Sequence, residues 1–401
     1  MTAPGNELRG VQRDLRGARD EQIIRVVAMV DAMPVRGAAD ALIAPLRARL
    51  AQLRPCRPLT FARLLFTPLD PLILPAPRWG RGAIGVPRTV VAPFAALLRA
   101  AMREEGAAIE ARLAGHMADR QDILAEAGAA LWPRATALLP GLPPPPDWAA
   151  ATGLSVGDYA ALAGSVGAML AHAEPIARLA GATAPDGGEI DRLLTAAAEA
   201  GVLAMMASLL VARLGGAGQV LEALDELAAR PGATAERDAA ERACAFLLDG
   251  IEAAPLATMP LASAAEELRR TCGLLADLAA RAARRPLRQA RVDEVRREVD
   301  ASCRARFTGE IDAGLLARTA GLAAASDADI AGIEAAARDL RRFETTARRL
   351  GGAELYDREL RRAAIALHPP AGEDAAGRID RARLVEILQG PDAARAMLAA
   401  P

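Results

Sequence analysis

Apolar residues recur every three or four positions along most of this chain, and strict alternation with a period of two is almost absent. Ile330, Ile333, Ala337 and Leu340 form one such stripe, which predicts a narrow seam for a neighbouring helix. The apolar fraction is 52% but only 3% of residues are aromatic, so the core must consist of alanine, leucine and valine. Such packing favours helices. The sequence therefore predicts an all-α fold, an irregular multi-helix bundle.

A proline-rich spacer divides the predicted helices into two parts. The segment LLPGLPPPPDW, residues 138–148, contains four consecutive prolines that no helix interior accommodates. A chain of 401 residues also exceeds what one hydrophobic core usually supports. We therefore predict an N-terminal helical domain over 1–137, a polyproline linker over 138–148 and a C-terminal helical domain over 149–401.

Helix starts are indicated where a short oxygen-bearing side chain stands three residues before an acidic one. Pro286 is expected to open a helix at its first turn. The pairs that indicate a start are Asp186 with Glu189, Ser263 with Glu266, and Ser326 with Asp329.

Several kinds of catalysis are excluded because all 49 basic residues are arginine. Without lysine there is no P-loop lysine for phosphates and no Schiff base to pyridoxal phosphate. The four cysteines, Cys56, Cys244, Cys272 and Cys303, show no C-x-x-C spacing. We expect no metal and no cofactor.

The stretch GLSVGDYAAL, residues 153–162, has the G-x-S-x-G spacing of a nucleophile elbow. It resembles the nucleophile segment of malonyl-type acyltransferases, G-H-S-x-G-E-Y-A-A-L, with Leu154 in place of the histidine. That resemblance implies Ser155 as nucleophile and His172 or His368 as base. The other interpretation is a helix cap in which Ser155 pairs with Asp158. We favour the cap, because no β-branched run precedes Gly153 to supply the strand of an elbow.

Segment 54–88 combines bulky apolar and basic residues in a backbone broken by prolines. It is expected to form short helical turns joined by extended pieces. Its apolar side chains either enter the core or leave a patch exposed for a partner. The candidate partner-binding residues are Arg57, Phe61, Arg63, Phe66, Arg78, Trp79, Arg81 and Arg88.

Charge is distributed unevenly along the chain. Residues 36–99 carry ten arginines against two acids, whereas residues 148–280 carry eight arginines against seventeen acids. A second basic cluster recurs at helical spacing, although Pro286 interrupts it. Its members, a candidate patch for anionic partners, are Arg281, Arg284, Arg285, Arg288 and Arg291.

These observations favour a non-enzymatic binding or scaffolding protein that engages a protein partner through a helix groove or through segment 54–88. One alternative is a protein that binds nucleic acid or an anionic membrane surface through its arginine clusters. A second alternative is a serine acyltransferase or hydrolase built on Ser155. No small-molecule substrate is inferred. The N-terminal residues lack the apolar segment of a signal peptide, so a cytoplasmic location is expected.

Overall fold

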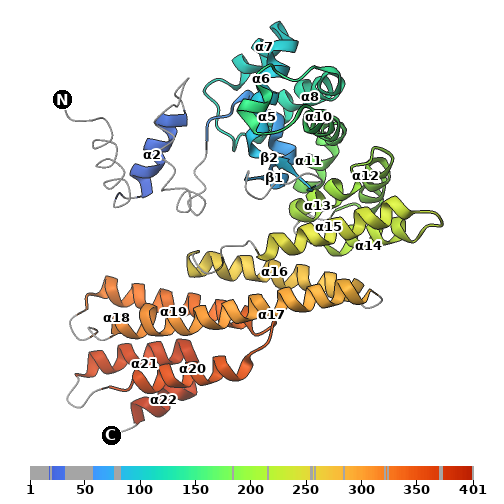
Figure 1. Ribbon diagram of the computed structural model, residues 1–401. Helices are drawn as coiled ribbons and strands as arrows, with labels where there is room; N and C mark the ends of the chain where they lie inside the picture. Colours follow the sequence, from blue (N-terminus) through green and yellow to red (C-terminus); the bar gives the residue numbers. More distant parts are fainter. Residues whose placement is uncertain are drawn as a thin grey trace. The chain divides into compact units, whose positions relative to one another are not determined.

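The predicted all-α class is confirmed by the computed structural model, in which helices account for most of the described residues (Figure 1). The structure describes residues 18, 20–31, 57–75, 83–182, 185–214, 216–252, 256, 259–282, 285–319, 322, 325–369 and 374–399. Within these ranges the strands amount to one parallel pair, β1 (Ile73–Leu74) and β2 (Val86–Pro87). Among the described helices, none combines the length and apolar character needed to cross a bilayer.

The chain forms two compact units. Unit 1 comprises residues 1–214 and 223–243, and unit 2 comprises residues 215–222 and 244–401. The division passes through helices α14 (Gly218–Ala229) and α15 (Thr234–Glu252). The compact units therefore do not follow the predicted boundary at 138–148, which lies inside unit 1.

The predicted linker lies inside unit 1 because its ends are packed into the core. Leu139 and Trp148 are buried, and the Trp148 ring stacks on Phe94 with centroids 5.4 Å apart. Tyr159 meets both rings edge to face, and its hydroxyl donates a 2.7 Å hydrogen bond to the carbonyl of Leu142. Both ends of the proline run are therefore fixed in the core of unit 1, through Leu139 on one side and Trp148 on the other.

Unit 1 is built around helices α5, α6, α8 and α10, with α5 contacting both α6 and α8 and α8 contacting α10. The indole of Trp132 on α8 donates a 3.1 Å hydrogen bond to the carbonyl of Leu64 on α5, which fixes this contact. Its helices and 3₁₀ turns, besides those given above, are α2 (Asp20–Asp31), α5 (Phe61–Phe66), η2 (Thr67–Leu72), η4 (Arg88–Val90), α6 (Val91–Met102), α7 (Glu104–Leu113), α8 (Gln121–Leu138), η5 (Leu139–Gly141), α9 (Trp148–Thr152), α10 (Val156–Leu170), α11 (Ala173–Gly181), α12 (Gly187–Glu199) and α13 (Leu203–Leu214).

Unit 2 is a layered helical bundle in which α16 packs on α17 and α19, and α19 packs in turn on α21 (Figure 1). The predicted seam of α19 is present, since Ile333, Ala337 and Leu340 are buried. Helix α20 contacts α17 and α21, and α22 contacts α21. The helices of this unit are α16 (Leu261–Ala282), α17 (Pro286–Gly309), the π-helix η6 (Glu310–Leu316), α18 (Ala317–Thr319), α19 (Asp327–Ala347), α20 (Ala353–Ala366), α21 (Ala375–Gln389) and α22 (Pro391–Ala399).

The predicted helix starts are confirmed at three positions and wrong at one. Ser326 forms a complete capping box with Asp329, Asp186 accepts a hydrogen bond from the backbone of Gly188, and Pro286 opens α17. Ser263 instead lies in the first turn of α16, which begins at Leu261. There the carbonyl of Pro260 accepts from the Ala264 amide at 2.9 Å, so the helix starts directly after the proline.

Candidate functional site

Ser155 is the N-cap of α10, as the cap interpretation predicts. Its hydroxyl lies 2.6 Å from Oδ2 of Asp158 and accepts from the Asp158 amide at 3.2 Å, while Oδ2 also accepts from the Ser155 amide at 2.9 Å. Helix α9 and Gly153, in the left-handed conformation with φ 74°, precede it. A nucleophile elbow needs a buried strand at this place. Ser155 therefore lies between two helices, α9 and α10, and caps the second of them.

The apolar part of segment 54–88 belongs to the core of unit 1 wherever the structure describes it. Phe61 and Phe66 on α5 are only 5% and 2% exposed, and Leu64, Leu65 and Leu69 are fully buried. The backbone follows the predicted pattern of short turns and extended pieces, with α5, η2 and β1 in succession. Phe61 and Phe66 therefore belong to the core, and they are not available at the surface of unit 1 to bind a partner.

The described arginines of segment 54–88 belong to different elements: Arg57 precedes α5, Arg63 lies on α5, and Arg88 begins η4. Arg63 donates from Nη1 to the carbonyl of Pro58, and the carbonyl of Arg57 accepts from the Ala118 amide at 2.8 Å. Arg88 is exposed at the start of η4. Arg78, Trp79 and Arg81 lie outside the described residues.

The second basic cluster is divided between two helices and largely engaged. Arg281, at the end of α16, donates to the carbonyl of Gly218 at 2.8 Å. Arg285 precedes Pro286, and Arg288 is buried at 6% exposure. Arg291 pairs with Glu294 at 2.9 Å. Arg284 lies outside the described residues. A continuous phosphate-binding stripe is therefore not formed by the described members.

A cavity of about 190 Å³ in unit 1 lies beside the Ser155 cap. Small apolar side chains line much of it, and its polar groups are Asp158, Ser165 and Arg242. Pockets for drug-sized ligands usually enclose roughly 300–1,000 Å³, and the carboxylate of Asp158 is already used by the cap. Among the described residues, no cluster of three histidine, cysteine or acidic side chains has metal-binding geometry.

A larger hollow, of about 400 Å³, lies in unit 2 between α19 and α21. We call it the α19–α21 groove. Ile379 of α21 is 54% exposed in it, and Ile330 of α19 is half-buried. Two exposed alanines, Ala331 and Ala376, keep the groove open between them. The complete lining is Asp327, Ile330, Ala331, Glu334, Ala376, Ile379, Asp380 and Arg383.

The rim of the groove carries an excess of negative charge. Glu334 is buried and accepts from Arg338 at 2.6 Å and from Arg383 at 3.1 Å, so this carboxylate joins the two helices. Asp327 and Asp380 form no ion pair with any residue that the structure describes. A groove with an apolar centre and two such carboxylates suits a ligand that is apolar on one side and positively charged at its edges.

No protein family model matches this chain, and comparisons with curated proteins and with solved structures found no match.

The groove brings together residues that the sequence pattern only partly indicated. Ile330 stands in the predicted stripe of α19, at its N-terminal end, where the neighbouring helix no longer covers it. Ile379 was missed because it stands alone among charged residues in the sequence, between Arg378 and Asp380. An isoleucine flanked by charged residues inside a helix is a usable signal for an apolar contact, but only packing shows that it lies beside Ile330.

Proposed function

We propose that this protein is a non-enzymatic helical binding protein whose α19–α21 groove receives a basic amphipathic helix of a partner protein. The observation that carries the proposal is the exposure of Ile379. This isoleucine of α21 lines the groove together with the carboxylates of Asp327 and Asp380. Recognition of this kind places the apolar face of one helix into a hydrophobic groove between others. A cytoplasmic location remains part of the proposal.

The apolar centre supplies affinity. Ile379 is the more exposed of the two large apolar side chains in the groove, Ile330 and Ile379. Complete burial of an exposed aliphatic side chain contributes about 1.5–3 kcal/mol, so the half that remains exposed here corresponds to about 1 kcal/mol. Ile330 and the two alanines extend the same surface along the groove. A leucine or isoleucine of the partner would fit between them.

The charges set the preferred partner. Lining carboxylates outnumber the single lining guanidinium, that of Arg383, three to one. Arginine or lysine residues that flank the apolar face of the partner would therefore meet opposite charge, whereas acidic residues there would be repelled. Because these charges lie at an exposed rim, salt is expected to weaken the interaction.

The other two hypotheses find less support. For a binder of anionic surfaces, the described residues of the two predicted arginine clusters are divided among separate helices, and several already contact carbonyls or carboxylates. For a serine hydrolase, the hydroxyl of Ser155 is engaged by Asp158 in a helix cap. The groove is therefore the stronger basis for a function than either the arginine clusters or Ser155.

The test is a titration of the full chain with a fluorescent amphipathic peptide of about 18 residues, roughly five helical turns. One peptide carries leucines on one face and arginines beside them, and the comparison peptide carries glutamates in place of the arginines. Fluorescence anisotropy is expected to show binding of the basic peptide alone. Ile379→Gln, which removes the apolar contact without adding a charge, is expected to weaken binding about fivefold, equivalent to about 1 kcal/mol.

The matched control is Ile365→Gln. Ile365 is 70% exposed on α20 and does not line the groove, so the same change of polarity there should leave binding unchanged. Equal binding of the acidic peptide would contradict the charge argument. Equal losses in the two variants, or no binding of the basic peptide at all, would contradict the groove as the site.

A further inference from the structure

A second pocket, of about 360 Å³, lies at the other end of the α19–α21 pair. The groove uses residues 327–334 and 376–383, whereas this pocket uses residues 341–348 and 388–389 of the same two helices. Helix α20 closes its side. We call it the arginine pocket, and its lining residues are Arg341, Arg348, Asp357, Leu360, Arg361, Leu388 and Gln389.

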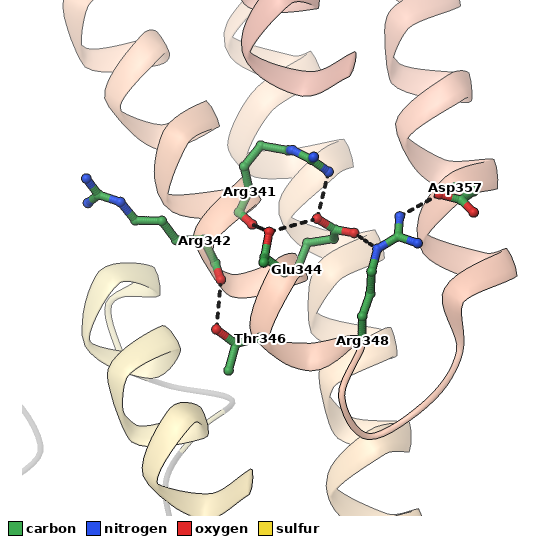
Figure 2. A network of polar contacts seen from close by, with 7 residues as sticks. Arg341, Arg342, Glu344, Thr346, Arg348 and Asp357 are labelled. Carbon is green, nitrogen blue, oxygen red and sulfur yellow. Dashed lines mark hydrogen bonds and ion pairs between the residues drawn. The ribbon is translucent and has the colours of Figure 1, made fainter. Parts of the chain in front are cut away.

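A buried carboxylate holds two of its arginines. Glu344 is only 1% exposed and lies between Arg341 and Arg348 on α19 (Figure 2). It accepts from Nη1 of Arg341 at 2.6 Å and from Nε of Arg348. A buried ion of this kind is tolerated only when its partners are fixed in place. Both guanidinium groups are thereby oriented before any ligand arrives.

Arg348 is constrained from two further sides. Its Nη2 lies 2.5 Å from Oδ1 of Asp357 on α20 (Figure 2), and its guanidinium lies 5.9 Å from the centre of the Tyr356 ring. That ring is fully buried and packs edge to face on Phe307. A cation over an aromatic ring is stabilised by the ring quadrupole. Arg348 is therefore the rigid centre of the pocket.

Arg361 adds a positive charge and forms no ion pair within the described part of the chain. Its charge does act on Asp357, whose pKa is lowered first by the hydrogen bond from Arg348 and also by the nearby charge of Arg361. The Nε of Arg361 donates to the backbone carbonyl of Asp357 at 3.2 Å, and this hydrogen bond orients the Arg361 guanidinium. Three arginines and two acids, Glu344 and Asp357, thus meet at this place. Burial is the main cause that lowers the pKa of the Arg341 guanidinium; the charge of Arg348 lowers it further, and the charge of Asp357 raises it.

We propose that the arginine pocket binds a phosphate group, either free or as the ester of a small molecule. Three guanidinium groups on two helices present more N–H donors than the two oxygens of a carboxylate can accept, whereas a phosphate group offers three oxygens or more. Leu360 and Leu388 supply apolar wall next to the donors, which suits the organic part of an ester. This inference uses other residues than the groove and does not depend on the proposed function.

The experiment measures binding of inorganic phosphate and of phenyl phosphate to the full chain by calorimetry at low ionic strength. We expect at least one of the two phosphate compounds to bind saturably, with a midpoint below about 10 mM. Tighter binding of phenyl phosphate would identify an ester as the better ligand, and equal binding would identify the free ion. Acetate at the same concentration should not compete.

Arg361→Gln is the decisive variant because Arg361 is exposed and its Nε donates to a carbonyl rather than to an acid. It is expected to weaken phosphate binding at least tenfold. Arg342→Gln is the matched control, since Arg342 is 72% exposed, pairs with Asp339 and points away from Glu344 and Arg348 (Figure 2). It removes the same charge and should change the affinity less than twofold, as a factor of two is only about 0.4 kcal/mol.

Three results would overturn the proposal: no saturation by either phosphate compound up to about 10 mM, equal losses in the two variants, or competition by acetate as strong as that by phosphate. Should Arg361→Gln fail to fold by circular dichroism, Arg361→Lys keeps the charge and loses the planar fork. That variant is expected to bind phosphate more weakly than the native chain, and unchanged affinity would contradict the role of Arg361.

Discussion

Replacing Glu344 with glutamine tests whether the buried carboxylate of α19 holds unit 2 together. Glu344→Gln keeps the size of the side chain and removes its charge. Arg341 and Arg348 would then share no carboxylate, and Arg348 would retain only Asp357. The two guanidinium groups would also repel one another without the negative charge between them.

The expected loss follows from burial. Removing one partner of a buried ion pair usually costs about 3–5 kcal/mol. The side chains of Arg341 and Arg348 are 35% and 29% exposed, so water compensates them in part. Allowing for that screening, we expect Glu344→Gln to reduce the free energy of unfolding of unit 2 by about 2–3 kcal/mol.

The assay is urea denaturation of the full chain, followed by far-UV circular dichroism. The control is Asp339→Asn, which removes a carboxylate of the same helix that pairs with the exposed Arg342 at 3.3 Å. An exposed pair contributes less than about 1 kcal/mol, so this control should shift the midpoint slightly. If the two variants lower the midpoint equally, or if Glu344→Gln has no effect, the reasoning about the buried carboxylate is refuted.

Three further predictions concern stability and reactivity. Ser155→Ala should destabilise the chain by about 1 kcal/mol and Ser155→Asp should restore most of it, because either oxygen can cap α10; labelling of native Ser155 by a fluorophosphonate would contradict the cap. Phe66→Ala should cost about 3–5 kcal/mol in thermal or urea unfolding, and a loss below about 1 kcal/mol would mean that Phe66 is not a core residue. Burial raises the pKa of the Cys303 thiol from 9.0 to about 12, so the stability from its neutral form is complete below pH 9.0 and is lost as pH rises towards about 12. Alkylation of Cys303 in the native protein should be slow below pH 9.0, and rapid alkylation there would show that the thiol is accessible.

The helical class and most helix starts followed from local chemistry. Ser155, Asp186 and Ser326 were each predicted as caps from the residues that follow them, and each occupies an N-cap position. Ser263 shows where the rule fails: Pro260 starts the helix earlier, and the serine falls inside its first turn. Local patterns identify helices well because the first-turn hydrogen bonds involve residues close in the sequence.

The division of the chain and the arginine pocket could not be predicted in the same way. The proline run at 138–148 is rigid, but rigidity alone does not separate domains, and Trp148 ties the segment into the core. The pocket needs Arg361 of α20 to approach Arg341 and Arg348 of α19, which depends on tertiary packing. The spacing of Arg341, Glu344 and Arg348 on one helix face is compatible with ion pairs along α19, but it carries no information about a pocket.

Hydrogen–deuterium exchange of the full chain, with and without the basic amphipathic peptide, tests the central claim most directly. The proposal predicts slower exchange on peptide binding in residues 327–334 and 376–383, which line the α19–α21 groove. Protection confined to residues 57–75 or 286–297, with none in the groove, would contradict it and would favour the two arginine-containing segments as the binding surface.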